Sequence, residues 1–219
     1  MAPVLGYWDI RGLGQSIRFM LVYTETEFEH KKYAFGPAPE YSTDAWLKEK
    51  YTLGLDFPNL PYYIDDDVKL TQSIAIMRYL ARKHKLEPET EAEKIRADLV
   101  EQQVADFRRS FGKTAYDSSF KIKKEYMKVL PDKLKEFSDY LGKRLWFASQ
   151  DKITYVDFMM YEVLYRHKLI APDCLNKFQN LKDYFDRFEK LPAIQKYMQS
   201  PDYIKWPSHG DNAVYISHS

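Results

Sequence analysis

The chain has 219 residues, of which 45% are hydrophobic and 30% charged, and its formal net charge is +1. This length allows one large or two small domains with a proper core. A charge balance so close to neutral argues against nucleic acid as a partner, which requires a basic surface. No apolar run approaches the ~20 residues that cross a bilayer, and residues 1–12 lack the basic and apolar regions of a secretory signal. We therefore expect a cytoplasmic protein with no membrane partner.

The cysteine and histidine content argues against disulfide, redox and metal chemistry. Cys174 is the only cysteine, which excludes an internal disulfide, a CxxC pair and a zinc cage. We interpret it as a free structural thiol, because nothing nearby in the sequence would activate it. The five histidines show no metal-ligand spacing, so the sequence predicts no metal site.

The first third of the chain alternates strand and helix signals. The predicted elements are a strand at 4–8, a helix at 16–23, a strand at 28–33, a short helix at 44–51, a hairpin at 62–71 and a helix that begins at 72–73. The initial strand–helix–strand unit implies parallel pairing and a right-handed crossover. The complete order, βαβ-α-ββ-α, is that of a thioredoxin-like domain, which we place at residues 1–84.

After a short linker at residues 85–90, every strong signal is helical. On the helix that begins at Glu91, one apolar stripe contains Ala97, Val100, Val104, Phe107 and Phe111. A second helix is predicted at 121–142, with Gly142 as its stop signal. Further helices are expected at 158–165, 178–190 and 192–199, and residues 200–219 are expected to wrap the surface. The fold class is thus α+β with two domains, an N-terminal thioredoxin-like domain and an all-α helical bundle at residues 91–219.

The central helix of this second part has a sharp start signal. Thr154 and Asp157 form a capping box with the S/T-x-x-D pattern. The residues at 158–165 are apolar nearly all round, which predicts the buried centre of a bundle. Small-molecule sites usually form in the cleft between two such domains.

Tyr7 is a candidate site residue because it ends the first strand, just before a helix begins. Ligands bind at that end of a parallel sheet, and a helix N-terminus favours negative charge. A protonated tyrosine hydroxyl there could stabilise a thiolate or an oxyanion. Taken alone, Tyr7 is better explained as a core aromatic in a tyrosine-rich protein. The neighbouring Gly12-Leu13-Gly14 suggests a dinucleotide loop, but Ile17 occupies the place of the third glycine.

Several stretches together resemble the mu class of glutathione transferases. In the first part they are GYWDIRGL (Gly6–Leu13), WLKEK (Trp46–Lys50), LGLDFPNLPYYID (Leu53–Asp65) and LTQSIAI (Leu70–Ile76), and the loop GPAP (Gly36–Pro39) is similar to the extra loop of that class. The helical part agrees at Thr154–Asp157 and at Leu191–Ile194. The resemblance covers roughly residues 3–200 and implies the cytosolic glutathione transferase fold.

The resemblance implies an enzyme that conjugates reduced glutathione to small, mostly apolar electrophiles. Glutathione is then a co-substrate, and no other cofactor is expected. Tyr7 would donate a hydrogen bond to the glutathione thiolate, and Tyr116 would assist in the electrophile site. Ile10 and Leu13 would form an apolar wall. Tyr116 is alternatively another buried aromatic, because the motif around it is short.

The resemblance also implies how each part of the tripeptide is held. The residues are Gln72 and Ser73 for the γ-glutamyl carboxylate, Leu60 and a cis Pro61 for the cysteinyl backbone, Trp46 and Lys50 for the glycyl carboxylate, and Trp8 and Asn59 to complete the site. Asp106 matches an acid that reaches across a dimer interface towards the tripeptide amino group.

Two further positions suggest a homodimer. Phe57 matches a residue that inserts into the partner's helical domain, although internal packing of Phe57 is the alternative. Arg78 matches a residue near the two-fold axis.

The sequence departs from the class pattern at several positions. Thr43 stands where the class often has a basic residue, and Arg108 and Arg109 bring charge near the presumed mouth of the electrophile site. The tail from Pro201 on, with Trp206 and His209, matches poorly. This tail should line the second-substrate pocket, so the sequence does not define which electrophile is preferred. A carrier of apolar ligands with the same fold is the competing function, whereas a thioredoxin-type redox protein lacks a cysteine near the first helix.

Overall fold

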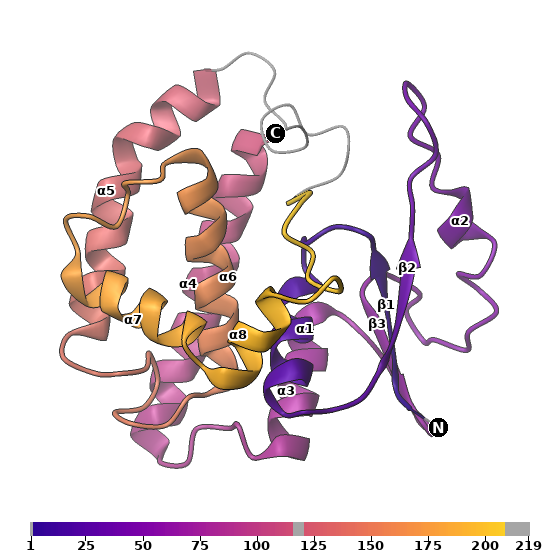
Figure 1. The fold of residues 1–219 in the computed structure, drawn as a ribbon, viewed down its shortest axis with the longest axis horizontal. Helices are drawn as coiled ribbons and strands as arrows, with labels where there is room; N and C mark the ends of the chain where they lie inside the picture. The colour runs from indigo at the N-terminus through magenta and orange to yellow at the C-terminus, as the bar shows by residue number, and fades with distance from the viewer. Residues whose placement is uncertain (1, 116–120, 209–219) are drawn as a thin grey trace.

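The computed structural model describes residues 2–115 and 121–208. Its N-terminal part is a four-stranded mixed sheet with three helices, and its C-terminal part is a bundle of helices (Figure 1). The set of strands and helices expected from the sequence is therefore confirmed. Tyr116 and His209 lie outside the described residues, so the expectations for them remain predictions.

The sheet has the strand order β2-β1-β3-β4. Its strands are β1 (Val4–Trp8), β2 (Glu29–Tyr33), β3 (Tyr62–Asp65) and β4 (Val68–Thr71). The β1 and β2 strands are parallel, as the intervening helix predicts, whereas β1–β3 and β3–β4 are antiparallel. The register places Leu5 opposite Tyr63, and both side chains are fully buried.

Three helices accompany the sheet. They are α1 (Gln15–Tyr23), α2 (Asp44–Leu47) and α3 (Ser73–His84). The α1 and α3 helices lie between the sheet and the helical part, while α2 lies on the outer side (Figure 1). The short helix ends four residues earlier than predicted, because the chain turns at residues 48–51.

The helical part contains α4 (Glu91–Ala115), α5 (Lys121–Leu141), α6 (Tyr155–Ile170), α7 (Gln179–Glu189) and α8 (Pro192–Met198). The apolar stripe predicted on α4 is buried along its whole length. Gly142 ends α5 as predicted: it has φ +59°, and its N–H donates to the Ser138 carbonyl at 2.9 Å. Only glycine adopts this backbone conformation without steric cost.

The α6 helix is the centre of the bundle, as its composition predicts. Residues 155–164 are all buried. At its start, the Asp157 carboxylate accepts hydrogen bonds from the Thr154 N–H at 2.9 Å and the Thr154 hydroxyl at 3.1 Å. It also accepts one from the Phe147 N–H at 2.9 Å. This network satisfies donors that the first turn of a helix otherwise leaves unpaired.

The two parts share one core. Phe19 of α1 meets Tyr161 of α6 and Phe188 of α7 edge to face, at centroid distances of 5.3 and 5.6 Å. The linker is also fixed, because the Leu86 carbonyl accepts from the Tyr155 N–H at 3.1 Å. Continuous packing therefore fixes how the two parts sit against each other.

The described end of the tail differs from the surface wrap that was expected. Ile204 is 6% exposed and Ser208 is fully buried. The carbonyls of Pro207 and Ser208 accept from the N–H groups of Arg11 and Gly12, at 2.9 and 3.1 Å. The buried loop before α1 needs backbone partners, and the tail supplies them.

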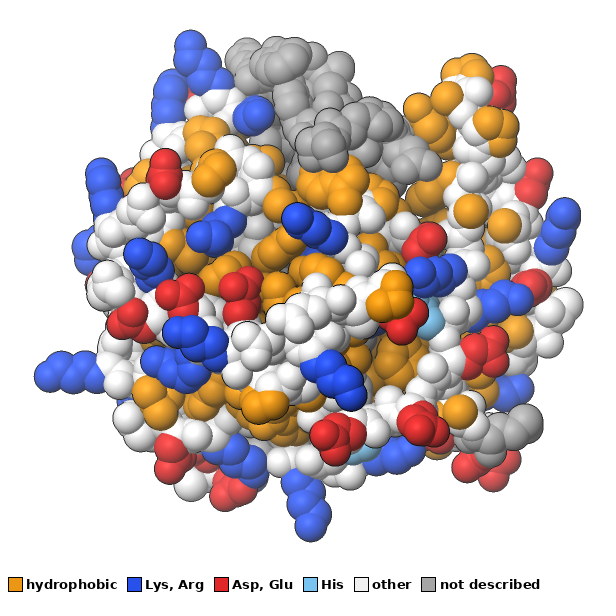
Figure 2. Space-filling model, viewed as in Figure 1, with side chains coloured by type: hydrophobic (Ala, Val, Ile, Leu, Met, Phe, Trp, Pro, Cys, Tyr) orange, Lys and Arg blue, Asp and Glu red, His pale blue; other side chains and the backbone are white. Residues whose placement is uncertain are grey.

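The outer surface carries charges of both signs, which are interspersed across the face in Figure 2. This distribution agrees with the formal net charge of +1. Within residues 2–115 and 121–208, no helix combines the length and apolarity that crossing a membrane requires.

Candidate active site

Tyr7 lies at the end of β1 with its ring 5% exposed. Its hydroxyl oxygen accepts a hydrogen bond from the Leu13 N–H at 2.9 Å. A tyrosine hydroxyl can accept and donate at the same time. No acceptor for its own proton lies within the described residues, so Tyr7 keeps that proton available for a ligand.

Two glycines make the space that the Tyr7 ring occupies. A Cβ at Gly12, which has φ +43°, would lie 2.4 Å from the Tyr7 hydroxyl oxygen. A Cβ at Gly14 would lie 2.7 Å from Tyr7 Cδ1. The Gly12-Leu13-Gly14 sequence is thus explained by close packing against the tyrosine, without a dinucleotide.

The electrostatic surroundings keep the Tyr7 hydroxyl protonated at neutral pH. Burial raises its pKa above the ordinary value of 10.0, while the Leu13 hydrogen bond and the charges of Arg18, Arg166 and Arg108 oppose that shift. The same cations would favour any anion placed beside the hydroxyl. The site can therefore donate a hydrogen bond to a thiolate and stabilise its charge.

An open cavity of about 350 Å³ faces this hydroxyl. Its lining comes from β1, from the loop before α1, and from α4 and α6: Tyr7, Ile10, Gly12, Leu13, Ala105, Arg108, Arg109, Gly112 and Arg166. Ile10 and Leu13 lie where an apolar wall was expected, and Arg108 and Arg109 bring the expected charge. Arg166 was missed, although a charged residue in a mostly apolar helix was a signal in the sequence.

The predicted tripeptide residues Trp46 and Leu60 belong to one buried cluster that also contains Tyr7, and the partly buried Trp8 packs against it. Trp46 is 5% exposed and meets the Tyr33 ring at a centroid distance of 5.4 Å. Trp8 stacks on Phe35 at 4.3 Å. Ring contacts therefore hold both tryptophan side chains close to the cluster that contains Tyr7.

The backbone at the β3 and α3 ends has unusual conformations where binding was expected. The Leu60–Pro61 peptide is cis, as predicted, and the Asn59 side chain accepts from the Leu60 N–H at 2.9 Å. Gln72 has φ 69° directly before α3, with an exposed side chain. A non-glycine residue in this region costs of order 1–3 kcal/mol, and such strain is concentrated at ligand sites.

The structure does not bring every predicted binding residue to the cavity beside Tyr7. Lys50 is half-buried, with its ammonium 5.2 Å from the Tyr51 ring centroid. Asp106 is exposed and forms an ion pair with Arg109 at 2.8 Å. It borders a neighbouring groove between α4 and α5, so within one chain it does not reach Tyr7. Ser73 is the first residue of α3 and is partly exposed.

The predicted dimer residues lie on the outer surface. Phe57 is 77% exposed, which rules out internal packing within the chain. The Arg78 guanidinium donates to both carboxylate oxygens of Glu101, at 2.7 and 2.8 Å. This pair joins α3 to α4, a contact that the sequence did not reveal.

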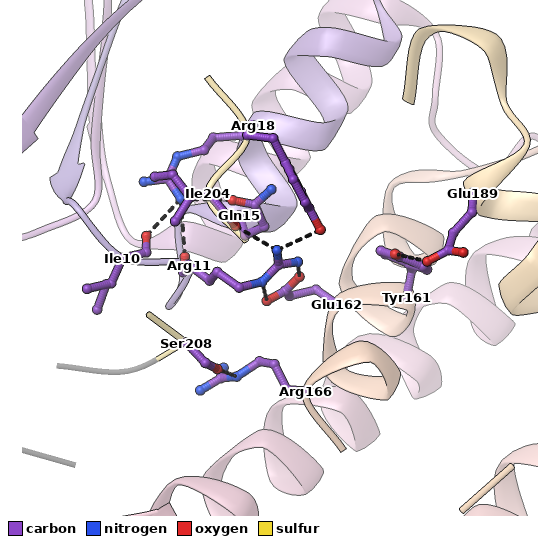
Figure 3. A network of polar contacts seen from close by, with 11 residues as sticks. Ile10, Arg11, Gln15, Arg18, Tyr161, Glu162, Arg166, Glu189, Ile204 and Ser208 are labelled. Atoms are coloured by element: carbon purple, nitrogen blue, oxygen red, sulfur yellow. Dashed lines mark hydrogen bonds and ion pairs between the residues drawn. The ribbon is translucent and has the colours of Figure 1, made fainter. Parts of the chain in front are cut away.

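A buried ion pair fixes the loop that carries the site (Figure 3). Arg11 donates to both oxygens of Glu162 on α6, at 3.1 and 2.5 Å, and to the Ile204 carbonyl at 2.7 Å. Burial alone would lower the pKa of Arg11, but Glu162 overrides it and raises the pKa. Arg18 donates to the Ile10 carbonyl at 2.9 Å. Sequence reasoning missed Arg11 and Glu162, although a carboxylate in an apolar helix implies a buried cation.

Other chemistries find little support in the described part of the chain. No cluster of three or more His, Cys, Asp or Glu residues that could hold a metal occurs there. Burial raises the pKa of the Cys174 thiol to about 11, which makes it unreactive at neutral pH.

Comparison with known proteins identifies relatives along the whole chain. The family model "Glutathione S-transferase, N-terminal domain" matches residues 3–82, and "Glutathione S-transferase, C-terminal domain" matches residues 105–201. "Glutathione S-transferase Mu 1" of Bos taurus is 52% identical over 216 residues, covering 98% of this chain and 99% of the relative. The protein of the same name from Homo sapiens is 51% identical, with the same coverage.

Solved structures agree with the sequence relatives. The glutathione S-transferase Blo t 8 superposes with a TM-score of 0.88 at 33% identity, covering 98% of this chain and 100% of that chain. The Pi-class glutathione S-transferase of Onchocerca volvulus gives a TM-score of 0.86 at 31% identity, covering 97% and 100%.

Proposed function

The chain belongs to the glutathione S-transferase family, in its mu class, and conjugates glutathione to electrophilic compounds; from this premise we propose the roles of its residues. Tyr7 donates a hydrogen bond to the glutathione sulfur and keeps it ionised. The observation that carries this role is the Leu13 N–H bond to the Tyr7 oxygen, which orients the hydroxyl while its proton stays available.

The energy of one hydrogen bond is sufficient for this role. A hydrogen bond to a charged group contributes about 1.5–3 kcal/mol. Each pKa unit of the thiol corresponds to about 1.4 kcal/mol, so its pKa falls by roughly one to two units. Tyr7 is a donor and not a base, and the thiol proton leaves to solvent. The thiolate then attacks the electrophile, forming a carbon–sulfur bond as the leaving group departs.

The exposed backbone and side chains around α3 hold the γ-glutamyl end of glutathione. Ser73 opens α3, where unpaired N–H groups and the helix dipole favour a carboxylate. The strained Gln72 beside it directs its side chain to the same group. Leu60, before the cis bond to Pro61, pairs with the cysteinyl backbone in the manner of an added strand.

The other end of the tripeptide lies towards the aromatic cluster. Trp46 and Lys50 bind the glycyl carboxylate through the indole N–H and the ammonium group. Trp8 and Asn59 complete the peptide site. In the electrophile site, Ile10 and Leu13 pack against the apolar part of the substrate, and Tyr116 donates a hydrogen bond to it.

The working form is a homodimer. Phe57 is 77% exposed, and a cavity of about 320 Å³ lies between α4 and α5, lined by Leu99, Val100, Gln103, Lys133, Glu136, Phe137 and Tyr140. Insertion of Phe57 into this cavity of a second copy would remove two apolar surfaces from water. Arg78 lies near the two-fold axis, and Asp106 reaches the tripeptide amino group of the partner.

The protein acts in the cytoplasm and uses glutathione as a co-substrate with no further cofactor. A single cysteine whose thiol is partly buried suits a reducing compartment. Nucleophilic attack by a thiolate requires neither metal nor redox chemistry.

Replacement of Tyr7 by Phe tests the central role. We expect kcat/KM with 1-chloro-2,4-dinitrobenzene to fall tenfold or more, in line with one charge-assisted hydrogen bond. Glutathione should still bind, and the pH midpoint of kcat/KM should move upward because the bound thiol ionises less readily. Calorimetry and a pH-rate profile measure both effects. An unchanged rate and midpoint would contradict the role assigned to Tyr7.

A further inference from the structure

Three arginines line the cavity that faces Tyr7. Arg108 and Arg109 come from α4, and Arg166 comes from α6. No aspartate or glutamate is among the described residues that line this cavity. Ile10 and Leu13 form an apolar strip beside these cations. The cavity therefore combines an apolar wall with a strongly positive one, which an uncharged electrophile does not require.

The three guanidinium groups have different surroundings. Arg109 is largely exposed and is paired with Asp106 at 2.8 Å, so solvent and its partner weaken its field. Arg166 is 3% exposed, and its Nε donates to the Ser208 hydroxyl at 3.2 Å. Arg108 is half-buried and has no hydrogen bond or ion pair within residues 2–115 and 121–208. Arg108 is thus the cation best able to accept an anionic ligand.

The charges of Arg108 and Arg166 act on one another. The pKa of Arg166 is lowered to about 10, mainly by burial and also by the charge of Arg108, against the opposing effect of Glu162. Burial likewise lowers the pKa of Arg108. An anion bound between two such cations would offset both desolvation and repulsion.

We propose that the electrophile site selects substrates that carry an acidic group, such as a carboxylate, held by Arg108 in the field of Arg166. The apolar body of the substrate lies on Ile10 and Leu13, and its reactive carbon faces the sulfur beside Tyr7. A planar guanidinium binds a carboxylate through two parallel hydrogen bonds. This inference rests on the proposed function and narrows its substrate class from apolar to amphipathic, acidic electrophiles.

A matched pair of aryl chlorides tests the proposal. The pair is 4-chloro-3,5-dinitrobenzoate and its methyl ester, which differ in one negative charge. In both, the thiolate carbon–sulfur bond forms as the carbon–chlorine bond breaks and chloride leaves. After division by the uncatalysed rate with glutathione, we expect the wild-type kcat/KM to favour the carboxylate by roughly tenfold, the effect of one charge-assisted pair. The preference should fall as salt rises.

Substitutions of Arg108 locate the selectivity. Arg108→Gln should reduce the carboxylate-to-ester ratio to about one, Arg108→Lys should retain part of it, and Arg108→Glu should reverse it. Lys113→Gln, on the exposed side of the same helix, removes the same charge from the chain and should leave the ratio unchanged. S-(4-carboxybenzyl)glutathione and its carboxamide analogue give the same comparison by equilibrium binding, without turnover.

The outcomes distinguish failure of this inference from failure of the proposed function on which it rests. Conjugation of both chlorides with no carboxylate preference in the wild type, or with equal ratios in Arg108→Gln and Lys113→Gln, overturns the acidic-substrate proposal alone. Failure of the wild-type protein to accelerate either reaction overturns the proposed function and the inference with it.

Discussion

The two walls of the cavity are built in different ways. The wall from the β1–α1 loop presents one hydroxyl and two apolar side chains, held by glycines at positions 12 and 14 and by backbone hydrogen bonds. The wall from α4 and α6 presents three arginines. The first wall is shaped by close contacts within residues 7–14, and the tail and Glu162 support its loop. The second wall depends on the packing of helices that are distant in sequence.

We therefore assign different roles to the two walls, one in the reaction step and one in the choice of the second substrate. Under the proposed roles, the hydroxyl wall acts on the glutathione sulfur, so a change there should affect every electrophile. The arginine wall is proposed to hold the second substrate, so substitutions there should alter which compound reacts. The charges of Arg108 and Arg166 also act on any anion beside Tyr7. The Arg11–Glu162 pair joins the two walls, since Arg11 belongs to the loop and Glu162 to α6.

Breaking the Arg11–Glu162 pair, which joins the two walls, should have the largest effect on stability. Glu162→Gln leaves the Arg11 charge buried without its partner, and we expect the free energy of unfolding to fall by about 3–5 kcal/mol. Urea unfolding followed by circular dichroism, at one fixed protein concentration, measures the change. Asp139→Asn, which breaks an exposed pair with Lys135, is the matched control and should change stability little. Equal effects of the two substitutions would show that the buried pair does not join the walls.

The next prediction concerns the contact between two copies of the chain, in which Phe57 is proposed to insert into the α4–α5 cavity. Phe57→Ala should weaken the dimer by about 1.5–3 kcal/mol, the contribution of one buried large apolar side chain. Sedimentation velocity over a dilution series measures the dissociation constant. Tyr51→Ala, which removes another 77% exposed aromatic ring, serves as the control. A dimer that is equally stable with and without Phe57 would rule out this insertion.

A substitution at Gly12, which packs against the Tyr7 ring, tests the hydroxyl wall. Gly12→Ala places a methyl group 2.4 Å from the Tyr7 oxygen at a positive φ, so the ring or the loop must shift. We expect kcat/KM for both the charged and the neutral aryl chloride to fall by roughly tenfold, because a misplaced donor loses most of its hydrogen-bond energy. The ratio between the two substrates should stay the same. A change in that ratio would mean that the walls are not independent.

Sequence reasoning was most successful where a local pattern has one physical solution. Spacing and residue type predicted the order of strands and helices along the chain, the parallel pairing of β1 with β2, the buried stripe on α4, the capping box at Thr154 and the stop at Gly142. Tyr7 became a candidate because the end of a strand before a helix is a favourable place for a polar group. The resemblance to the mu class supplied its role, which remains a prediction. The short helix at Asp44 was predicted too long, since helix ends are weakly encoded.

The features that were missed depend on contacts between distant segments. Arg11 and Glu162 are 151 positions apart, and Arg166 enters the cavity only because α6 packs against α4 and α1. Charge in the apolar α6 pattern was visible in the sequence, but its partner was not. The roles of Gln72, Ser73, Lys50 and Asp106 remain predictions, because they concern a bound tripeptide or a second chain.

The docking of Pro207 and Ser208 onto the backbone of Arg11 and Gly12 limits how far the two halves can be treated as exchangeable modules. A chimera joined within residues 85–90 would take the loop beside Tyr7 from one parent and the support for that loop from the other. Recombination between related enzymes should therefore succeed only when the segment after α8 is inherited together with the N-terminal half.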